Sequence, residues 1–155
     1  MNVETRLVSV LMADDDADDR MLAKDAWEET RPATKLDFVE DGEQLLDYLR
    51  HRGKYTGRGA APLPNIILLD LNMPKKDGRE VLREIKTDPL LKRIPVIVLT
   101  TSRAEEDIAK SYDLGVNSFI VKPARFEALV EVMRRVAEYW FGVVELPDNH
   151  LTRPN

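Results

Sequence analysis

Short runs of apolar residues alternate along the chain with stretches in which apolar positions recur every three or four residues. A short, nearly continuous apolar run is typical of a strand that is buried on both faces. The clearest run, Ile66 to Leu69, ends at Asp70, and Pro74 prevents its continuation as a central strand. The pattern predicts strands at residues 7–13, 36–40, 66–69, 94–100 and 117–121.

The stretches between these runs have the apolar spacing of helices that bury one face. Two of them open on Asp-Gly pairs, at Asp41 and Asp77, and Ser102 and Glu105 have the spacing of a capping box. We expect helices at residues 20–30, after 41–42, after 77–78, after 102–105 and at 126–141. Residues 53–64 hold three glycines and two prolines and are expected to form a long loop.

Strands and helices therefore alternate five times. Apolar strands that are joined by helices form a parallel sheet with helices on both faces, which is an α/β fold. A chain of 155 residues is long enough to build its own core. We expect one domain over residues 1–155, with a core at about 7–141 and a polar C-terminal extension at 142–155.

Polar residues follow the predicted strands at the points where the strands end. Asp14 and Asp15 follow the first strand, Asp70 the third, Thr100 closes the fourth, and Lys122 follows the fifth. The carboxyl ends of parallel strands share one edge of the sheet, where such folds place their binding crevice. The alternation predicts that these groups, distant in sequence, converge there.

Carboxylates that converge repel one another unless a cation lies between them. All-oxygen ligands without histidine or cysteine select a hard ion, and Mg²⁺ fits best. A nearby lysine and hydroxyl, Lys122 and Thr100, suit a phosphoryl group. The nucleophile at this edge is a carboxylate, which would form an aspartyl phosphate. Three further acids, Asp16, Asp18 and Asp19, follow the acid pair. They fit a role in this site and a role as the acidic start of a helix equally well.

Composition removes several classes of function. The formal net charge is -5, so the chain lacks the excess of basic residues that is typical of proteins that bind nucleic acid. The chain has no cysteine, which suits a reducing cytoplasm, and only two histidines. No apolar run approaches the ~20 residues that span a bilayer, and Met1 to Arg6 has no signal-peptide pattern. We expect a cytoplasmic protein that binds neither nucleic acid nor membrane.

Several motifs together resemble the response-regulator receiver domains of two-component signalling, including the chemotaxis regulator. They are the acid pair Asp14-Asp15, Asp70 followed by Leu71-Asn72-Met73-Pro74, Asp77-Gly78, Thr100, and Lys122-Pro123. The resemblance covers Leu7 to about Phe141. It implies a doubly wound, flavodoxin-like domain with five parallel strands in the order 2-1-3-4-5 and five helices.

The resemblance also implies a role for each matching residue. Asp70 is expected to be the phosphoacceptor and a metal ligand, and Mg²⁺ the cofactor. The other implied roles are metal binding by Asp15 directly, by Asp14 through water and by the backbone carbonyl of Asn72, phosphoryl stabilisation by Lys122, and switching by Thr100 and Phe119. The peptide bond between Lys122 and Pro123 is expected to be cis.

Finer features resemble the stand-alone regulators of phytochrome histidine kinases. They include Asp16 and Asp19, the long loop at 53–64, the segment 74–82, and Glu138 to Phe141 leading to Leu146-Pro147. This resemblance implies a bacteriophytochrome kinase as the phosphate donor. With no further domain visible, output would pass through a protein partner, a homodimer or onward phosphotransfer.

The last helix is apolar over a wider arc than a surface helix normally buries. This width is explained either by core packing alone or by a partner surface. We favour a homodimer through the face built from the fourth helix, fifth strand and fifth helix. The residues expected at this interface are Val132, Val136, Tyr139, Trp140 and Val143.

Three other functions fit the sequence less well. Mg²⁺-dependent phosphatases with an aspartate nucleophile resemble one another in an Asp-x-Asp arrangement on the first strand. Here the candidate nucleophile, Asp70, follows the third strand, and Asn72 stands where the second acid would be. A nucleotide- or flavin-binding module needs a glycine-rich loop after the first strand, where this chain has aspartates. A degenerate receiver, which binds partners without phosphate, would lack some of the active-site positions, but all of them are present here.

Since the phosphatase alternative fits less well, we expect no enzyme activity beyond the protein's own phosphorylation and dephosphorylation.

Overall fold

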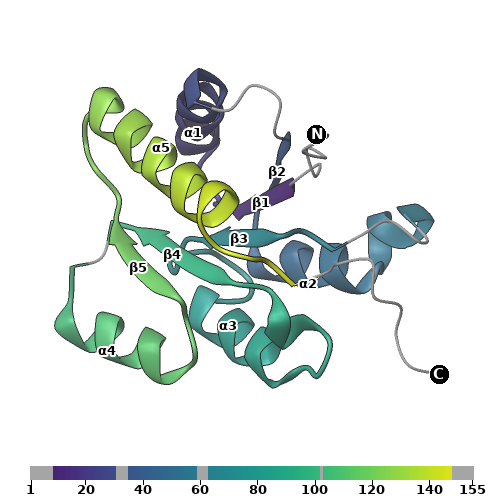
Figure 1. The fold of residues 1–155 in the computed structure, drawn as a ribbon. Helices are drawn as coiled ribbons and strands as arrows, with labels where there is room; N and C mark the ends of the chain where they lie inside the picture. Colours follow the sequence, from purple (N-terminus) through teal and green to yellow (C-terminus); the bar gives the residue numbers. More distant parts are fainter. Residues whose placement is uncertain (1–8, 31–34, 59–62, 102, 148–155) are drawn as a thin grey trace.

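A computed structural model describes residues 9–30, 35–58, 63–101 and 103–147 (Figure 1). Its strands form one parallel sheet in the order β2-β1-β3-β4-β5, which confirms the predicted flavodoxin-like topology. The strands are β1 Ser9–Ala13, β2 Lys35–Val39, β3 Ile66–Leu69, β4 Val96–Thr100 and β5 Ser118–Val121. The helices are α1 Ala17–Thr30, α2 Gly42–Arg50, α3 Gly78–Thr87, α4 Glu105–Asp113 and α5 Phe126–Gly142, with short 3-10 helices at Gly53–Arg58 and Leu91–Arg93.

Two helical layers enclose the sheet. Helices α1 and α5 pack on one face, and α2 and α3 pack on the other, with α4 beside β5 (Figure 1). Successive residues of β1 show why its run is apolar throughout, since Met12 joins the cluster under α1 and α5, and Leu11 joins the cluster under α2 and α3. No helix in the described ranges has the length and apolar character that crossing a membrane requires.

Helix α1 begins three residues earlier than predicted, because Asp16 caps it. The Asp16 carboxylate accepts the backbone N–H groups of Asp18 at 2.8 Å and of Asp19 at 3.1 Å. These groups have no partner inside the helix, so a side-chain acceptor stabilises the first turn. The helix-start interpretation of this acidic segment is therefore correct for Asp16.

One local prediction was wrong and another stays untested. Helix α4 begins at Glu105 with Ala104 as its N-cap, and the predicted capping box involves Ser102, which lies outside the described residues. Residues 53–58 form a 3-10 helix instead of an irregular loop, which is braced by an edge contact between the Tyr48 and Tyr55 rings. Ser102, residues 7–8 of the first predicted strand, residues 59–62 of the predicted loop and residues 148–155 of the predicted extension lie outside the described residues.

The residues of α5 that were predicted to form an interface differ in how far they are buried. Val136 is 7% exposed and packs in the core with α1, so it is removed from the predicted surface. Val132 and Trp140 are partly buried against the same cluster, whereas Tyr139 and Val143 are 53% and 74% exposed. The wide apolar arc thus serves both the core and the surface, because the helix lies on α1 along one side only.

Gly78 lets α3 start directly against the end of β3. A Cβ atom at this position would lie 2.6 Å from the carbonyl oxygen of Asp70 and 2.7 Å from the Cα of Leu71. These are backbone atoms, which cannot move aside without displacing the strand end. The glycine of the Asp-Gly pair is therefore required by close approach, while Asp77 caps the helix by accepting the Arg79 N–H at 2.8 Å.

We predict that Gly78→Ala lowers the free energy of unfolding by about 1–3 kcal/mol through this overpacking. Urea denaturation measures the change. Gly142→Ala is the matched control, since a Cβ atom there meets nothing within 4 Å. Equal effects of the two substitutions would contradict the explanation.

Candidate functional site

Backbone pairing just beyond the strand ends aligns the predicted site residues. The N–H of Asp14 donates to Val39, at the end of β2, and the N–H of Asp70 donates to Ala13, at the end of β1. The N–H of Lys122 donates to the carbonyl of Thr100 at 2.7 Å, which brings the end of β5 beside β4. The side chains that follow the strands therefore emerge on one edge of the sheet.

Three carboxylates form the centre of this edge. Asp14, Asp15 and Asp70 each present an oxygen, and these oxygens lie within 4.8 Å of one another. Asp14 and Asp70 are buried, whereas Asp15 is exposed. A donor set made of carboxylate oxygens fits a hard divalent cation such as Mg²⁺ or Mn²⁺ better than a softer metal.

The Lys122 ammonium lies among carboxylates. Its Nζ donates to Asp14 at 2.7 Å, to Asp19 at 3.2 Å and to Asp70 at 3.4 Å. Its side chain is only 9% exposed. Burial alone lowers the pKa of Lys122, but the carboxylates of Asp14, Asp70 and Asp19 outweigh burial and raise this pKa. The ammonium therefore keeps its charge and partly compensates the acids around it.

Burial also acts on the acid at the centre. It raises the pKa of Asp14, although the hydrogen bonds from Lys122 and from the Asp16 N–H oppose the rise. Asp14, Asp15 and Asp70 bring three negative charges against the single positive charge of Lys122. The residues present therefore suit a divalent cation, which would balance the remaining charge.

Each oxygen of Asp70 has its own environment. Oδ1 accepts the hydroxyl of Thr100 at 2.9 Å and the backbone N–H of Asn72 at 3.1 Å, while Oδ2 faces Lys122. Thr100 is fully buried, and its hydroxyl reaches the carboxylate from the neighbouring strand β4. The structure thus gathers Asp14, Asp15, Asp70, Thr100 and Lys122, and the loop after β3 places Asn72 beside them.

Phe119 lies on β5 and packs, partly buried, against the core cluster under α2 and α3. Its backbone N–H donates to the hydroxyl of Tyr112 on α4 at 3.2 Å. The described backbone contains no cis peptide bond, so the predicted cis bond before Pro123 was wrong. The trans form is the intrinsically favoured one for a residue before proline.

Two residues that the structure places near the site were not predicted as site residues, although Asp19 was noted as part of the acidic segment. Asp19 binds Lys122, and Arg20 donates from Nη1 to the carbonyl of Asp14 at 2.8 Å. The sequence signal for both is their place in the first helical turn that follows the acid pair Asp14-Asp15.

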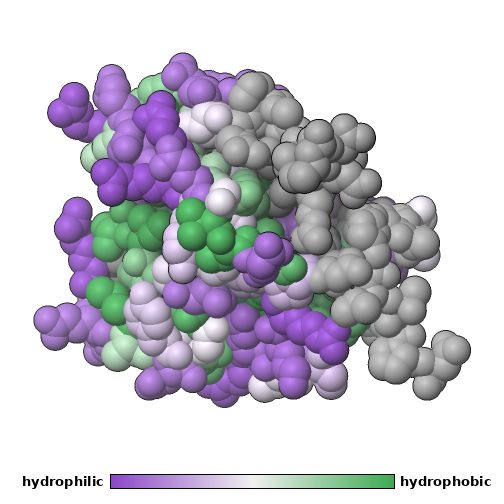
Figure 2. Space-filling view, viewed as in Figure 1, coloured by the Kyte–Doolittle hydropathy of each residue, from purple (hydrophilic) through white to green (hydrophobic). Residues whose placement is uncertain are grey.

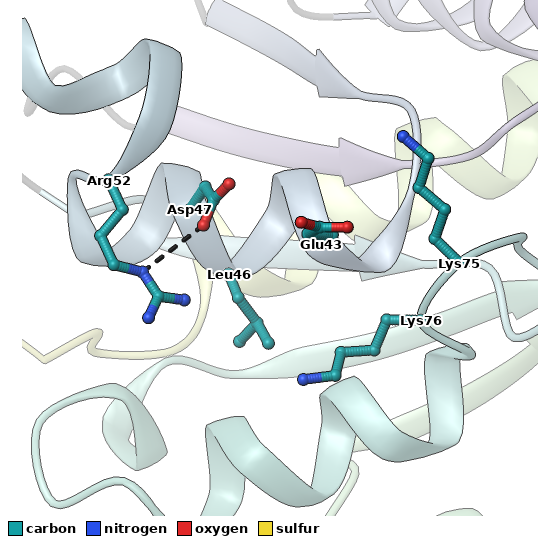
Figure 3. Close-up of a pocket in the computed structure, with 6 residues that line it drawn as sticks. All are labelled: Glu43, Leu46, Asp47, Arg52, Lys75 and Lys76. Carbon is teal, nitrogen blue, oxygen red and sulfur yellow. Dashed lines mark ion pairs between the residues drawn. The ribbon is translucent and has the colours of Figure 1, made fainter.

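A hollow lies between α2 and the loop that joins β3 to α3 (Figure 3). It has a volume of about 550 Å³. Its cations are each paired with an acid, since Arg52 meets Asp47, Lys75 meets Asp41, and Lys76 meets Glu84. It holds none of the predicted site residues, and its lining is Glu43, Leu46, Asp47, Arg52, Lys75 and Lys76.

Comparisons of the sequence with known proteins give one family. Residues 10–134 match the response regulator receiver domain. The chain is 41% identical over 138 residues to response regulator Rcp1 of Synechocystis, covering 89% of this chain and 92% of that protein. It is 40% identical over 134 residues to Probable methanogenesis regulatory protein FilR2 of Methanothrix harundinacea, covering 86% of this chain and 83% of that protein.

Solved structures agree with this result. The phosphorylated cyanobacterial phytochrome response regulator RcpA superposes with a TM-score of 0.84 at 43% identity, covering 91% of this chain and 99% of that chain. The Mn²⁺-bound form of Rcp1 superposes with a TM-score of 0.82 at 40% identity, with 91% and 99% covered. The acidic edge formed by Asp14, Asp15 and Asp70 is typical of receiver phosphorylation sites. The chain therefore belongs to the response regulator receiver domain family, and it is not an enzyme apart from the chemistry of its own phosphorylation.

Proposed function

We propose that this protein accepts a phosphoryl group from a histidine kinase on Asp70. The observation that carries the proposal is the arrangement around this buried carboxylate. Its Oδ1 is held by Thr100 and Asn72, and its Oδ2 faces the Lys122 ammonium. A positioned carboxylate beside a cation and a hydroxyl donor is suited to attack on phosphorus.

In the transfer step, an Asp70 oxygen attacks the phosphorus of a phosphohistidine. The P–O bond forms as the P–N bond breaks, and the leaving imidazole nitrogen takes up a proton. Lys122 pairs with the oxygens of the incoming group, and the Thr100 hydroxyl donates to one of them. Attack by water on the aspartyl phosphate later releases inorganic phosphate and restores Asp70.

Asp14, Asp15 and Asp70 would hold Mg²⁺ together with the backbone carbonyl of Asn72. Two facts support this assignment: the three carboxylate oxygens lie within 4.8 Å of one another, and the relative Rcp1 has been solved in a Mn²⁺-bound form. When bound, the ion neutralises charge on the carboxylates and on the phosphoryl oxygens that meet there. Asp14 would contribute through water, since its two oxygens already bind Lys122 and the Asp16 N–H.

Thr100 and Phe119 would carry the signal away from Asp70. Once Asp70 is an acyl phosphate, its remaining oxygen is an uncharged carbonyl and the phosphoryl oxygens carry the charge, so the Thr100 hydroxyl, which now donates to the carboxylate, turns toward a phosphoryl oxygen. Phe119 would then move into the vacated space and alter its hydrogen bond to Tyr112 of α4. The face of α4, β5 and α5 changes as a result.

A phytochrome histidine kinase is the proposed donor, because the similar solved structures include a cyanobacterial phytochrome response regulator and two bacteriophytochrome response regulators. A kinase of this kind takes its phosphoryl group from ATP, so we place the exchange in the cytoplasm. Similarity at 40% identity to a methanogenesis regulator calls for a direct test. Phosphotransfer from a panel of purified histidine kinases, with and without a phytochrome sensor, tests the assignment. Transfer from the phosphorylated protein to a further phosphotransfer protein would indicate a relay role.

The output surface we propose is a homodimer interface on the face of α4, β5 and α5. Hydrophobic side chains gather over the end of α5 and over β5, between more polar regions above and below (Figure 2). On α5 and at its C-terminal end, Tyr139 and Val143 are well exposed, and Val132 and Trp140 are partly buried. Large exposed apolar groups at one helix end favour a protein contact over solvent.

Incubation with Mg²⁺ and acetyl phosphate is expected to add one phosphoryl group to the protein, stable in acid and labile in base. Asp70→Asn should abolish the addition, because the amide nitrogen does not replace the carboxylate nucleophile. Intact-mass spectrometry measures it. Asp25→Asn, on the exposed side of α1, should behave as wild type. Phosphorylation of the Asp70→Asn protein would overturn the assignment.

Replacing Lys122 should affect metal binding and phosphorylation in opposite directions. In Lys122→Met, Mg²⁺ should bind about tenfold more tightly, a change of about 1.4 kcal/mol, because no ammonium competes for the Asp14 and Asp70 oxygens. Phosphorylation by acetyl phosphate should slow, since no cation meets the phosphoryl group. Calorimetric titration and mass spectrometry measure the two quantities. Lys110→Met removes the same charge from an exposed site, and tighter Mg²⁺ binding in that control would argue against the explanation.

Dimer formation should depend on the exposed end of α5. Val143→Asp is expected to shift the dimer toward monomer by at least about tenfold in the dissociation constant, since it buries a charge in an apolar contact. Analytical ultracentrifugation, with and without phosphorylation, measures the shift. Met21→Glu makes a similar change on α1, outside the proposed face. A dimer that is lost with Met21→Glu and kept with Val143→Asp uses a different surface.

A further inference from the structure

Asp19 makes a contact that neither its helix nor the metal set requires. Its carboxylate accepts from the Lys122 ammonium at 3.2 Å, across 103 residues of sequence. It is not one of the three carboxylates whose oxygens gather within 4.8 Å. Its own backbone is held in the first turn of α1 by the Asp16 cap, so a regular element positions it.

We infer that Asp19 is a positioning residue that holds the Lys122 ammonium at the mouth of the site, in competition with the phosphoryl group on Asp70. By doing so it slows phosphorylation. This inference rests on the proposed function, because Lys122 must pair with the phosphoryl group for the competition to matter.

The number of donors and acceptors supports this competition. A lysine ammonium has three N–H donors, and here three carboxylates, Asp14, Asp19 and Asp70, accept from it. An incoming phosphoryl group must therefore displace one of them. Asp14 and Asp70 also belong to the proposed metal site, where a bound cation would draw on their oxygens. Asp19 is then the carboxylate left to compete for Lys122.

The three carboxylates that bind Lys122 differ in exposure, which indicates the direction in which Asp19 attracts the ammonium. The side chain of Asp19 is 37% exposed, whereas those of Asp70 and Asp14 are 10% and 0% exposed. The Asp19 contact therefore draws the ammonium outward, away from the buried oxygen that would carry the phosphoryl group. The charge of Asp19 also contributes to the raised pKa of Lys122, as expected for a pair that interacts directly.

The test compares Asp19→Asn with Asp18→Asn. Both changes remove one negative charge from the same turn of α1, but Asp18 is exposed and is not among the carboxylates that bind Lys122. With Mg²⁺ and acetyl phosphate, Asp19→Asn should be phosphorylated about two- to fivefold faster than Asp18→Asn, a range that suits a partly exposed ion pair. In a Lys122→Met background, Asp19→Asn should give no acceleration.

A second measurement needs neither metal nor phosphate. The ammonium protons of Lys122 should exchange with water slowly in the wild type, because three carboxylates hold them. NMR of the lysine side chain in metal-free buffer should show several-fold faster exchange in Asp19→Asn, and no change in Asp18→Asn.

The outcomes separate this inference from the proposed function. If the wild type is phosphorylated on Asp70 but Asp19→Asn matches Asp18→Asn in rate and exchange, the inference is overturned and the proposed function stands. Acceleration that persists without Lys122 also overturns it, since the effect then comes from charge alone. If Asp70 takes no phosphoryl group in the wild type, both fail together.

Discussion

One ammonium group stabilises the arrangement on which the site depends. Buried carboxylates are costly unless a cation or hydrogen bonds compensate them. Here Lys122 meets Asp14 from 108 residues away and Asp70 from 52 residues away. The charge balance of the site therefore exists only once β1, β3 and β5 occupy one sheet. In the proposed transfer the same ammonium pairs with the phosphoryl group, so the stability of the resting site and its proposed reactivity depend on one side chain.

Helix α4 is less buried than the helices that cover the two faces of the sheet. Helices α1 and α5 pack against each other and bury Trp27, Met133 and Val136 with the sheet. Helix α4 buries little besides Ser111. It is tied to α3 through Arg79, whose guanidinium donates to Asp107 at 2.7 Å, and to β5 through Tyr112. The helix for which we propose a change on switching thus has polar ties to its neighbours, which can be exchanged at lower cost than a packed core.

The phosphoryl site and the proposed partner surface lie in different parts of this chain. The strand ends hold the acids, the hydroxyl and the lysine, and they are buried together. The exposed ends of α1 and α5 carry Met21, Tyr139 and Val143, which take no part in the phosphoryl site. Relatives as different in description as Rcp1 and FilR2 are about equally similar to the chain, which fits a common site with variable surfaces.

The sequence by itself determined the alternation of strands and helices, the parallel sheet and the residues at its carboxyl edge, because hydrophobic period and strand length are local properties. It also singled out Asp70 by the apolar run before it. Tertiary structure alone decided that Val136 faces the core, that Asp19 binds Lys122, and that each Asp70 oxygen has separate partners. These outcomes depend on how elements far apart in sequence pack, and the residues next to a position in the chain do not determine that packing.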